Sequence, residues 1–184
     1  MAEPPTNSVS ATFHVHDMGE VKGFVGMKVM RNYADKLLTL SNPGHVIALL
    51  EAFGMPNVTP NKTQMMSRAK LAKMGKNLLP DTNRYAELVG SLLYLSTPTR
   101  PDIAFAVGVL SCYKACPEED HMRAVKGVLW YLRGATRLGI AYGAHKRLRG
   151  YVDADWAGDV DARRSTTGFI FTLNGGPVSW ASNR

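Results

Sequence analysis

Residues 148–180 constrain the fold more than any other part of this 184-residue chain. Three segments within them are rich in β-branched and aromatic side chains, which is typical of strands, and they cover residues 151–154, 168–173 and 177–180. The tripeptide Asn174-Gly175-Gly176 separates the last two segments. Its residues readily adopt the positive φ angles that a tight hairpin turn needs. The pattern therefore predicts a small sheet that contains a hairpin.

Asp153 lies inside the first of these predicted strands, among apolar residues. A carboxylate in such a place costs free energy unless it meets a cation or a metal ion. Asp155 follows two residues later and shares the face of Asp153 only if the strand continues regularly. We therefore regard Asp153 as a candidate metal ligand, whereas the role of Asp155 stays open.

The rest of the chain predicts an α+β fold in which a hairpin precedes several helices. Residues 23–30 and 36–40 predict the two hairpin strands, joined by residues 32–35, and residues 12–15 predict a further short strand. Apolar residues at helical spacing predict helices over about 43–53, 84–96, 101–110 and 117–134. Residues 55–80 contain three prolines and several basic side chains, and they predict a linker.

Local signals mark where these helices begin and end. Asn42 is a typical N-cap with Pro43 at the first helical position, and Gly54 is typical of a helix end. Gly127 within the last helix should cost roughly 1 kcal/mol relative to alanine, and the sequence offers no reason for it.

Positive charge is concentrated in the middle of the chain. Residues 61–150 hold 15 Lys and Arg against 6 Asp and Glu, a balance of +9, whereas the whole chain has a net charge of +7. A basic region between nearly neutral ends suits contact with a phosphate backbone. The alternative, a solvated basic face that binds nothing, is about equally compatible with charge alone.

Two other residue pairs have the spacing of metal ligands without enough partners. Cys112 and Cys116 share one helical face, but no second cysteine pair is present, which favours spare thiols. His14 and His16 share one strand face, but no third ligand is evident. No run approaches the ~20 apolar residues of a membrane span, and residues 1–20 lack the apolar core of a signal peptide. We expect an intracellular protein, cytoplasmic or nuclear, with no membrane partner.

Several segments resemble the Pol polyprotein of copia-type retrotransposons. The string Tyr-Val-Asp-Ala-Asp-Trp-Ala-Gly at 151–158, with Arg-Arg-Ser-Thr-Thr-Gly at 163–168, is similar to the start of its ribonuclease H domain. Tyr-Ala-Glu-Leu-Val-Gly-Ser-Leu-Leu-Tyr-Leu at 85–95 and Val-Leu-Trp-Tyr-Leu-Arg-Gly at 128–134 resemble the helical region that precedes that domain. The resemblance spans roughly residues 13–180, although Gly127 and Trp130 stand where the family often has arginine.

The resemblance implies roles for particular residues. Phe-Val-Gly-Met at 24–27 is similar to the primer grip of reverse transcriptases, so Phe24, Gly26 and Met27 are candidates to hold the end of the growing strand. The cations of the helical region would follow the phosphates of a template–primer duplex or RNA–DNA hybrid, and the candidates are Lys126, Arg133 and Arg137. Arg100 is better interpreted as the structural partner of a carboxylate such as Asp102 than as a reader of bases.

By the same resemblance, Asp153 is the bridging ligand of a ribonuclease H site that uses two Mg²⁺ ions. The other carboxylates of that site and the Tyr-x-Asp-Asp motif of the polymerase are not among these 184 residues. One carboxylate binds hydrated Mg²⁺ weakly, so we expect no tight cofactor binding and no enzymatic activity from this chain alone, although the parent family is enzymatic.

The resemblance also implies an organisation along the chain. Residues 1–10 would be a flexible arm, 11–80 the end of the polymerase palm with the start of the thumb, 81–146 the helical thumb and connection, and 147–184 a truncated ribonuclease H-like domain with a mixed sheet. We interpret the chain as a fragment that handles template–primer nucleic acid beside the remainder of the Pol polyprotein. The alternatives are a non-catalytic nucleic-acid-binding protein derived from the element, or a relic without function.

Overall fold

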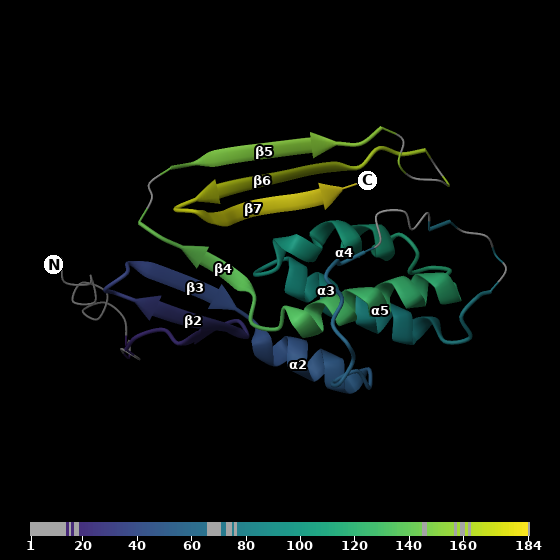
Figure 1. The fold of residues 1–184 in the computed structure, drawn as a ribbon, viewed down its shortest axis with the longest axis horizontal. Coiled ribbons are helices and arrows are strands. Elements are labelled where there is room, and N and C mark those ends of the chain that lie inside the picture. Colours follow the sequence, from purple (N-terminus) through teal and green to yellow (C-terminus); the bar gives the residue numbers. More distant parts are fainter. Residues whose placement is uncertain are drawn as a thin grey trace.

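The computed structural model describes residues 14, 16, 19–65, 71–72, 75, 77–144, 147–156, 158, 161 and 163–183. Two antiparallel sheets accompany a group of helices, which confirms the expected α+β class (Figure 1). The sheet drawn in yellow and olive lies over α4, and the purple and blue strands lie at one end of the helices. The predicted arm over residues 1–10 and the predicted strand over 12–15 fall outside the described residues, apart from His14, which belongs to no strand.

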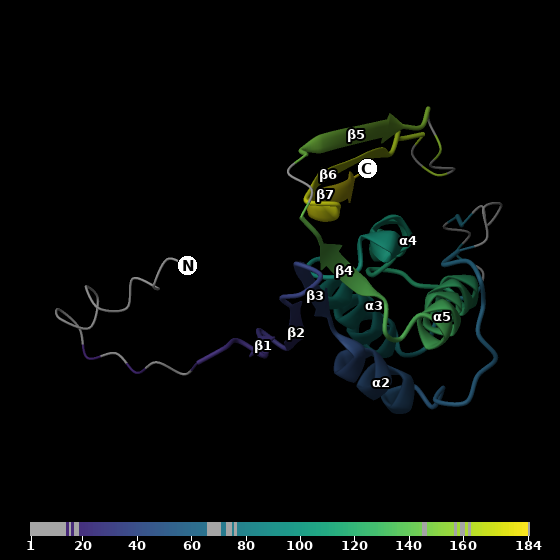
Figure 2. The ribbon, with the colours of Figure 1, turned by 60° about the vertical axis from the view of Figure 1, so that its left-hand side comes forward.

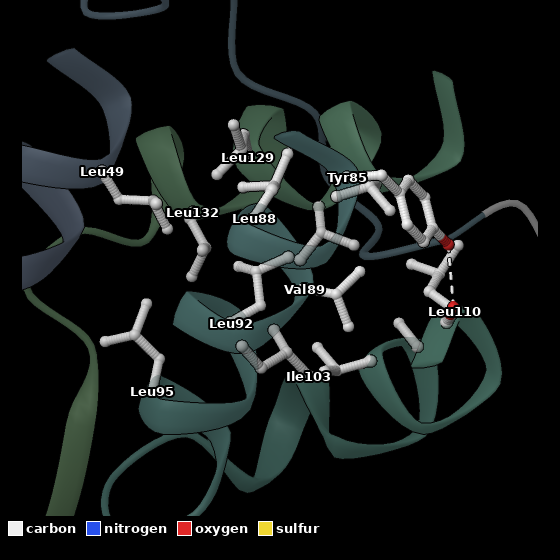
Figure 3. Packing of buried hydrophobic residues seen from close by; sticks show 14 of the residues in the cluster. Leu49, Tyr85, Leu88, Val89, Leu92, Leu95, Ile103, Leu110, Leu129 and Leu132 are labelled. Carbon is white, nitrogen blue, oxygen red and sulfur yellow. Dashed lines mark hydrogen bonds between the residues drawn. The ribbon is translucent and has the colours of Figure 1, made fainter. Parts of the chain in front are cut away.

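The helices form the core of the molecule, as their apolar stripes predict. They are α2 (Pro43–Ala52), α3 (Thr82–Ser96), the 3-10 turn η1 (Pro101–Ile103), α4 (Ala104–Ser111) and α5 (Glu119–Gly134). Leu88, Leu92 and Leu95 of α3 are fully buried between the neighbouring helices (Figure 3). The buried hydroxyl of Tyr85 donates a hydrogen bond to the Leu110 carbonyl at 2.8 Å, which ties α3 to α4.

The predicted start of α2 is confirmed in atomic detail. The side chain of Asn42 accepts a hydrogen bond from the His45 backbone N–H at 3.3 Å, and Pro43 occupies the first turn. Gly54, just beyond the helix, has a φ of 67°, a left-handed conformation that glycine adopts without strain.

The first sheet has the order β1-β2-β3-β4 and differs from the prediction in two ways. The predicted single strand over 23–30 is wrong, because a two-residue turn at Val25 and Gly26 divides it into β1 (Gly23–Phe24) and β2 (Met27–Asn32). Both turn residues have positive φ, 47° and 74°. The second difference is that this sheet extends beyond the predicted hairpin, since β4 (Gly139–Tyr142) pairs with β3 (Leu37–Ser41).

The second sheet contains the three predicted C-terminal strands, β5 (Arg149–Ala154), β6 (Thr167–Leu173) and β7 (Gly176–Asn183). The described strands are antiparallel throughout, so the prediction of a mixed sheet is wrong for them. Asn174 and Gly175 form the predicted tight turn with φ of 55° and 83°. The sheet rests on the helices through Trp180, whose Nε1 donates to the Ser96 carbonyl at 3.0 Å.

Residues 55–80 contain no helix or strand among their described members, apart from an isolated bridge between Leu78 and Glu118. Several of their apolar side chains pack against the helical core all the same, and these are Met55, Val58, Met65, Leu71 and Leu79. The described part of this predicted linker therefore belongs to the body of the molecule. None of the helices in the described part of the chain combines the length and apolar character that a membrane span needs.

Candidate functional site

Asp153 and Asp155 both line one hollow between the C-terminal sheet and the helices. Its volume is about 550 Å³, and its walls come from η1, α4 and the three strands β5 to β7. Aromatic side chains line much of it, namely Phe105, Tyr151, Phe169 and Trp180. The two carboxylates share this hollow because β5 keeps its pairing with β6 one residue beyond its end, where the Asp155 N–H donates to the Thr166 carbonyl at 3.0 Å.

The surroundings of the two carboxylates differ from the sequence-based expectation. Every residue of β5 is exposed, so Asp153 is not a buried charge that needs a counter-ion. One of its oxygens accepts the neighbouring Ala154 N–H at 3.0 Å. Asp155 accepts a hydrogen bond from the Thr166 backbone N–H and so braces the loop between β5 and β6.

These residues do not make a complete magnesium site. Among the described residues, no three His, Cys, Asp or Glu side chains gather closely enough to hold a metal ion. Asp153 and Asp155 supply carboxylate oxygens of the kind that Mg²⁺ prefers, but each already accepts a backbone hydrogen bond. We therefore assign no metal-dependent step to this hollow. His14, His16, Cys112 and Cys116 are all exposed, and both cysteines are free thiols.

The three candidate primer-grip residues lie at the β1–β2 turn. Phe24 is largely exposed, Gly26 is in the turn, and Met27 begins β2. The Tyr94 hydroxyl on α3 donates to the Val25 carbonyl at 3.0 Å, and a Cβ on Gly26 would lie 2.6 Å from this hydroxyl. Glycine is therefore required here both by its positive φ and by the close approach of a tyrosine.

The three candidate cations lie on the exposed side of α5 and just beyond its end. Lys126, Arg133 and Arg137 are all exposed. The opposite side of the helix is buried in the core and consists of His121, Val125, Val128, Leu129 and Leu132. Arg133 has a structural partner as well, since its Nε donates to the Pro56 carbonyl at 2.7 Å.

The structure does not bring the two groups of candidates together. Two views show the β1–β2 hairpin and α5 apart, with α3 between them (Figure 2). Sequence reasoning missed Tyr94 as the partner of the turn and the contact between Arg133 and Pro56. Their separations of 69 and 77 residues leave no local signal from which either contact could be read.

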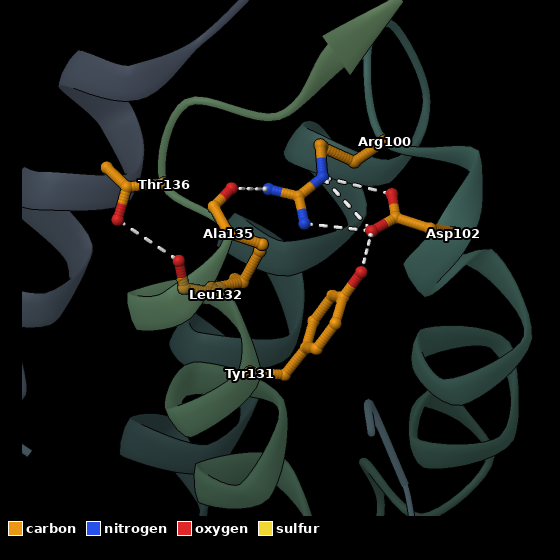
Figure 4. A network of polar contacts seen from close by, with 6 residues as sticks. All are labelled: Arg100, Asp102, Tyr131, Leu132, Ala135 and Thr136. Atoms are coloured by element: carbon orange, nitrogen blue, oxygen red, sulfur yellow. Dashed lines mark hydrogen bonds and ion pairs between the residues drawn. The ribbon is translucent and has the colours of Figure 1, made fainter. Parts of the chain in front are cut away.

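Arg100 has the structural role that the sequence predicts. It is 1% exposed, and its guanidinium binds both carboxylate oxygens of Asp102 and the Ala135 carbonyl (Figure 4). The Tyr131 hydroxyl donates to the same carboxylate at 2.7 Å. Burial raises the pKa of Asp102, but hydrogen bonds from Arg100, the charge of Arg100 and the bond from Tyr131 outweigh it and lower the pKa. The network connects η1 to the end of α5. Because the Arg100 guanidinium is buried in it, this side chain does not read the bases of a nucleic acid.

Comparison with known proteins shows the family to which the chain belongs. The chain is 40% identical over 184 residues to the Retrovirus-related Pol polyprotein from transposon TNT 1-94 of Nicotiana tabacum, a match that covers 95% of this chain and 14% of that polyprotein. It is 38% identical over 180 residues to the Pol polyprotein from transposon RE2 of Arabidopsis thaliana, which covers 97% of this chain and 12% of the relative. The chain belongs to the copia-type retrotransposon Pol family.

Membership of the copia-type Pol family is confirmed at the level of sequence, and the chain spans 14% and 12% of the length of these two relatives. A shorter protein is also similar: Secreted RxLR effector protein 161 of Plasmopara viticola is 49% identical over 102 residues, which are 54% of this chain and 72% of that protein. No protein-family model matches the chain, and no solved structure does.

Proposed function

We propose that this chain handles template–primer nucleic acid during RNA-directed DNA synthesis, as part of a copia-type Pol protein. The observation that carries the proposal is the exposed side of α5, where Lys126 and Arg133 lie opposite a buried side that is apolar apart from His121. Arg137 is a further exposed cation just beyond the end of the helix. Cations arranged in this way neutralise backbone phosphates without reading the sequence of bases.

The same proposal gives the flanking parts their roles. The helices α2 to α5 would correspond to the thumb and connection, with the β1–β2 turn as the primer grip. The C-terminal sheet would be the opening of a ribonuclease H-like fold, because its first strand and the residue that follows it place Asp153 and Asp155 at one hollow. The resemblance in sequence supports these assignments, and the remainder of a Pol polyprotein would be the physical partner.

Salt titration of nucleic-acid binding tests the proposal. Each phosphate contact contributes about −0.9 to the slope of log K against log salt, so three to five contacts predict a slope of roughly −3 to −5 for an RNA–DNA hybrid. The combined substitution Lys126→Gln and Arg137→Gln should make the slope shallower by about 2. Arg133 is left unchanged because its loss would also release the Pro56 carbonyl. Fluorescence anisotropy of a labelled hybrid at several salt concentrations gives both slopes.

A matched control distinguishes binding at a local site from a general effect of the net charge. Lys114 and Arg149 are exposed cations on other elements, so Lys114→Gln with Arg149→Gln changes the net charge equally. The proposal expects this variant to keep the slope of the unmodified chain. Equal slopes for all three proteins, or no binding at low salt, would contradict it.

A non-catalytic nucleic-acid-binding protein is the second candidate. The match to the Plasmopara viticola protein favours only one part of it, a shorter protein with this type of sequence, because 72% of that protein's length is matched by part of this chain. The neighbouring coding DNA discriminates between the candidates. An upstream Tyr-x-Asp-Asp motif favours the Pol protein, an expressed short transcript without it favours the second candidate, and frameshifts favour a relic.

A further inference from the structure

An indole stands among the cations of the exposed side of α5. Trp130 is 36% exposed, and helical spacing of three and four residues places it between Lys126 and Arg133 on one side of the helix. Lys126 and Arg133 are seven helical steps apart, which is a rise of about 10 Å, or about three base steps of ~3.4 Å. We call these three side chains the α5 stripe.

A second segment of the chain is held against the α5 stripe. The Asn61 backbone N–H donates to the Trp130 carbonyl at 3.1 Å, and Arg133 donates to the Pro56 carbonyl at 2.7 Å. Lys62 is exposed and follows Asn61 directly. The fold thus brings a further cation close to Trp130 from a segment about seventy residues away in sequence.

Space next to Trp130 is open. Gly127 lies three residues before it, and a Cβ built there would meet no neighbouring side chain within 4 Å. A helical side chain lies over the turn that precedes it, so Gly127 is the position that would otherwise border the indole. The glycine, which is unfavourable in a helix by roughly 1 kcal/mol, leaves this border free.

We propose that Trp130 stacks on an unpaired base while the flanking cations hold the adjoining phosphates, so that the α5 stripe takes single-stranded nucleic acid. Bases inside a duplex are stacked on each other and present no face to an indole. Unpaired bases do present a face, and aromatic stacking combined with a basic surface binds single strands regardless of their sequence. The inference rests on the proposed function and specifies its substrate, namely the unpaired strand next to the template–primer duplex.

Stacking predicts a pattern that charge alone cannot produce. Trp130→Ala should weaken binding of a labelled oligothymidylate by about five- to a hundredfold, with a much smaller effect on a duplex of equal length. Trp130→Phe keeps an aromatic face and should retain most of the affinity. An abasic phosphodiester strand, which has the charge but no bases, should bind equally to the unmodified chain and to Trp130→Ala.

The matched control is Tyr33→Ala. Tyr33 is 71% exposed in the turn between β2 and β3, and its neighbours in sequence, Asn32 and Ala34, carry no charge. This variant should bind oligothymidylate like the unmodified chain, and far-ultraviolet circular dichroism confirms that each variant is folded. If Trp130→Ala binds oligothymidylate unchanged, or if Tyr33→Ala is weakened equally, the stacking inference is overturned.

The result also separates this inference from the proposed function. Unchanged binding by Trp130→Ala, together with weaker binding by Lys126→Gln and Arg137→Gln, would overturn stacking and leave the phosphate contacts standing. Absence of binding to oligothymidylate, hybrid and duplex at low salt would overturn both.

Discussion

Single residues in this molecule hold the ends of neighbouring elements in place. His121 is an example at the start of α5, where it is 1% exposed. Its Nδ1 accepts the Glu118 backbone N–H at 2.9 Å, and its ring stacks on Tyr113 with centroids 3.9 Å apart. Only a neutral imidazole can accept at Nδ1, so the cap of α5 depends on the protonation state of this side chain.

The cap predicts a loss of stability in mild acid. Burial lowers the pKa of His121 below its usual value near 6.5, although the charges of Glu118, Asp120 and Asp161 oppose this. The unfolded chain therefore binds the proton first, and the free energy of unfolding should fall as the pH drops from about 6.5 toward the folded pKa. Above 6.5 the contribution is fully present. Urea unfolding of the chain between pH 5 and 8 measures this fall.

The variant His121→Gln separates the contribution of His121 to the pH dependence of stability from the contribution of the carboxylates. Glutamine at this position retains a side-chain oxygen that can accept the Glu118 N–H but does not titrate between pH 5 and 8. We expect a flatter pH profile for the variant, and an identical profile would show that other groups cause the change.

At the scale of elements, the helices and the C-terminal sheet differ in how completely they are covered. The core residues of α3, α4 and α5 are almost fully buried. In β5, by contrast, all six residues are exposed, and Val152 retains 81% of its accessible surface. The sheet is attached to the rest of the molecule mainly along β7. Trp180 bonds to the Ser96 carbonyl at the end of α3, and the Tyr142 hydroxyl of β4 donates to the Pro177 carbonyl at 2.7 Å.

This difference predicts the order of hydrogen exchange. Amides in the helices between residues 84 and 134 should exchange most slowly, because opening them exposes the shared core. Amides of β5 should exchange much faster, since that strand can separate at little cost in buried area. Native-state exchange followed by mass spectrometry ranks the two regions, and slower exchange in the C-terminal sheet would contradict the ranking.

At the scale of the whole molecule, the hollow that holds Asp153 and Asp155 depends on the sheet lying against η1 and α4. Two chain segments about fifty residues apart in sequence build its walls, so neither forms it alone. The hollow offers carboxylates and aromatic side chains, but within the described residues it gathers no third acidic or histidine ligand.

We therefore predict that the purified 184-residue chain does not cleave an RNA–DNA hybrid in the presence of Mg²⁺. Two carboxylates, each engaged by a backbone N–H, cannot clamp the two ions that this chemistry requires. Gel analysis of a labelled hybrid checks the outcome, with Asp153→Asn as the matched variant. Cleavage that disappears in Asp153→Asn would show that the site is complete.

The amino-acid sequence by itself determined the helices, the Asn42 cap of α2, the turn at Asn174 and the family. Each depends on residues a few positions apart, through helical spacing, side-chain capping or positive φ, or on strings that relatives share. The ion pair of Arg100 with Asp102 was predictable for the same reason, since two residues separate them.

Only the tertiary structure decided which distant segments meet. Leu40 pairs with Ile140 across β3 and β4, and β5 remains exposed. The turn that interrupts the predicted strand is hydrogen-bonded to Tyr94 through the Val25 carbonyl, and Arg133 is hydrogen-bonded to the Pro56 carbonyl. The physical reason is that local patterns specify an element and the side that it buries, whereas many partners can cover the same apolar side. The choice among partners depends on packing and hydrogen bonds over the whole chain, and no short stretch of sequence contains that information.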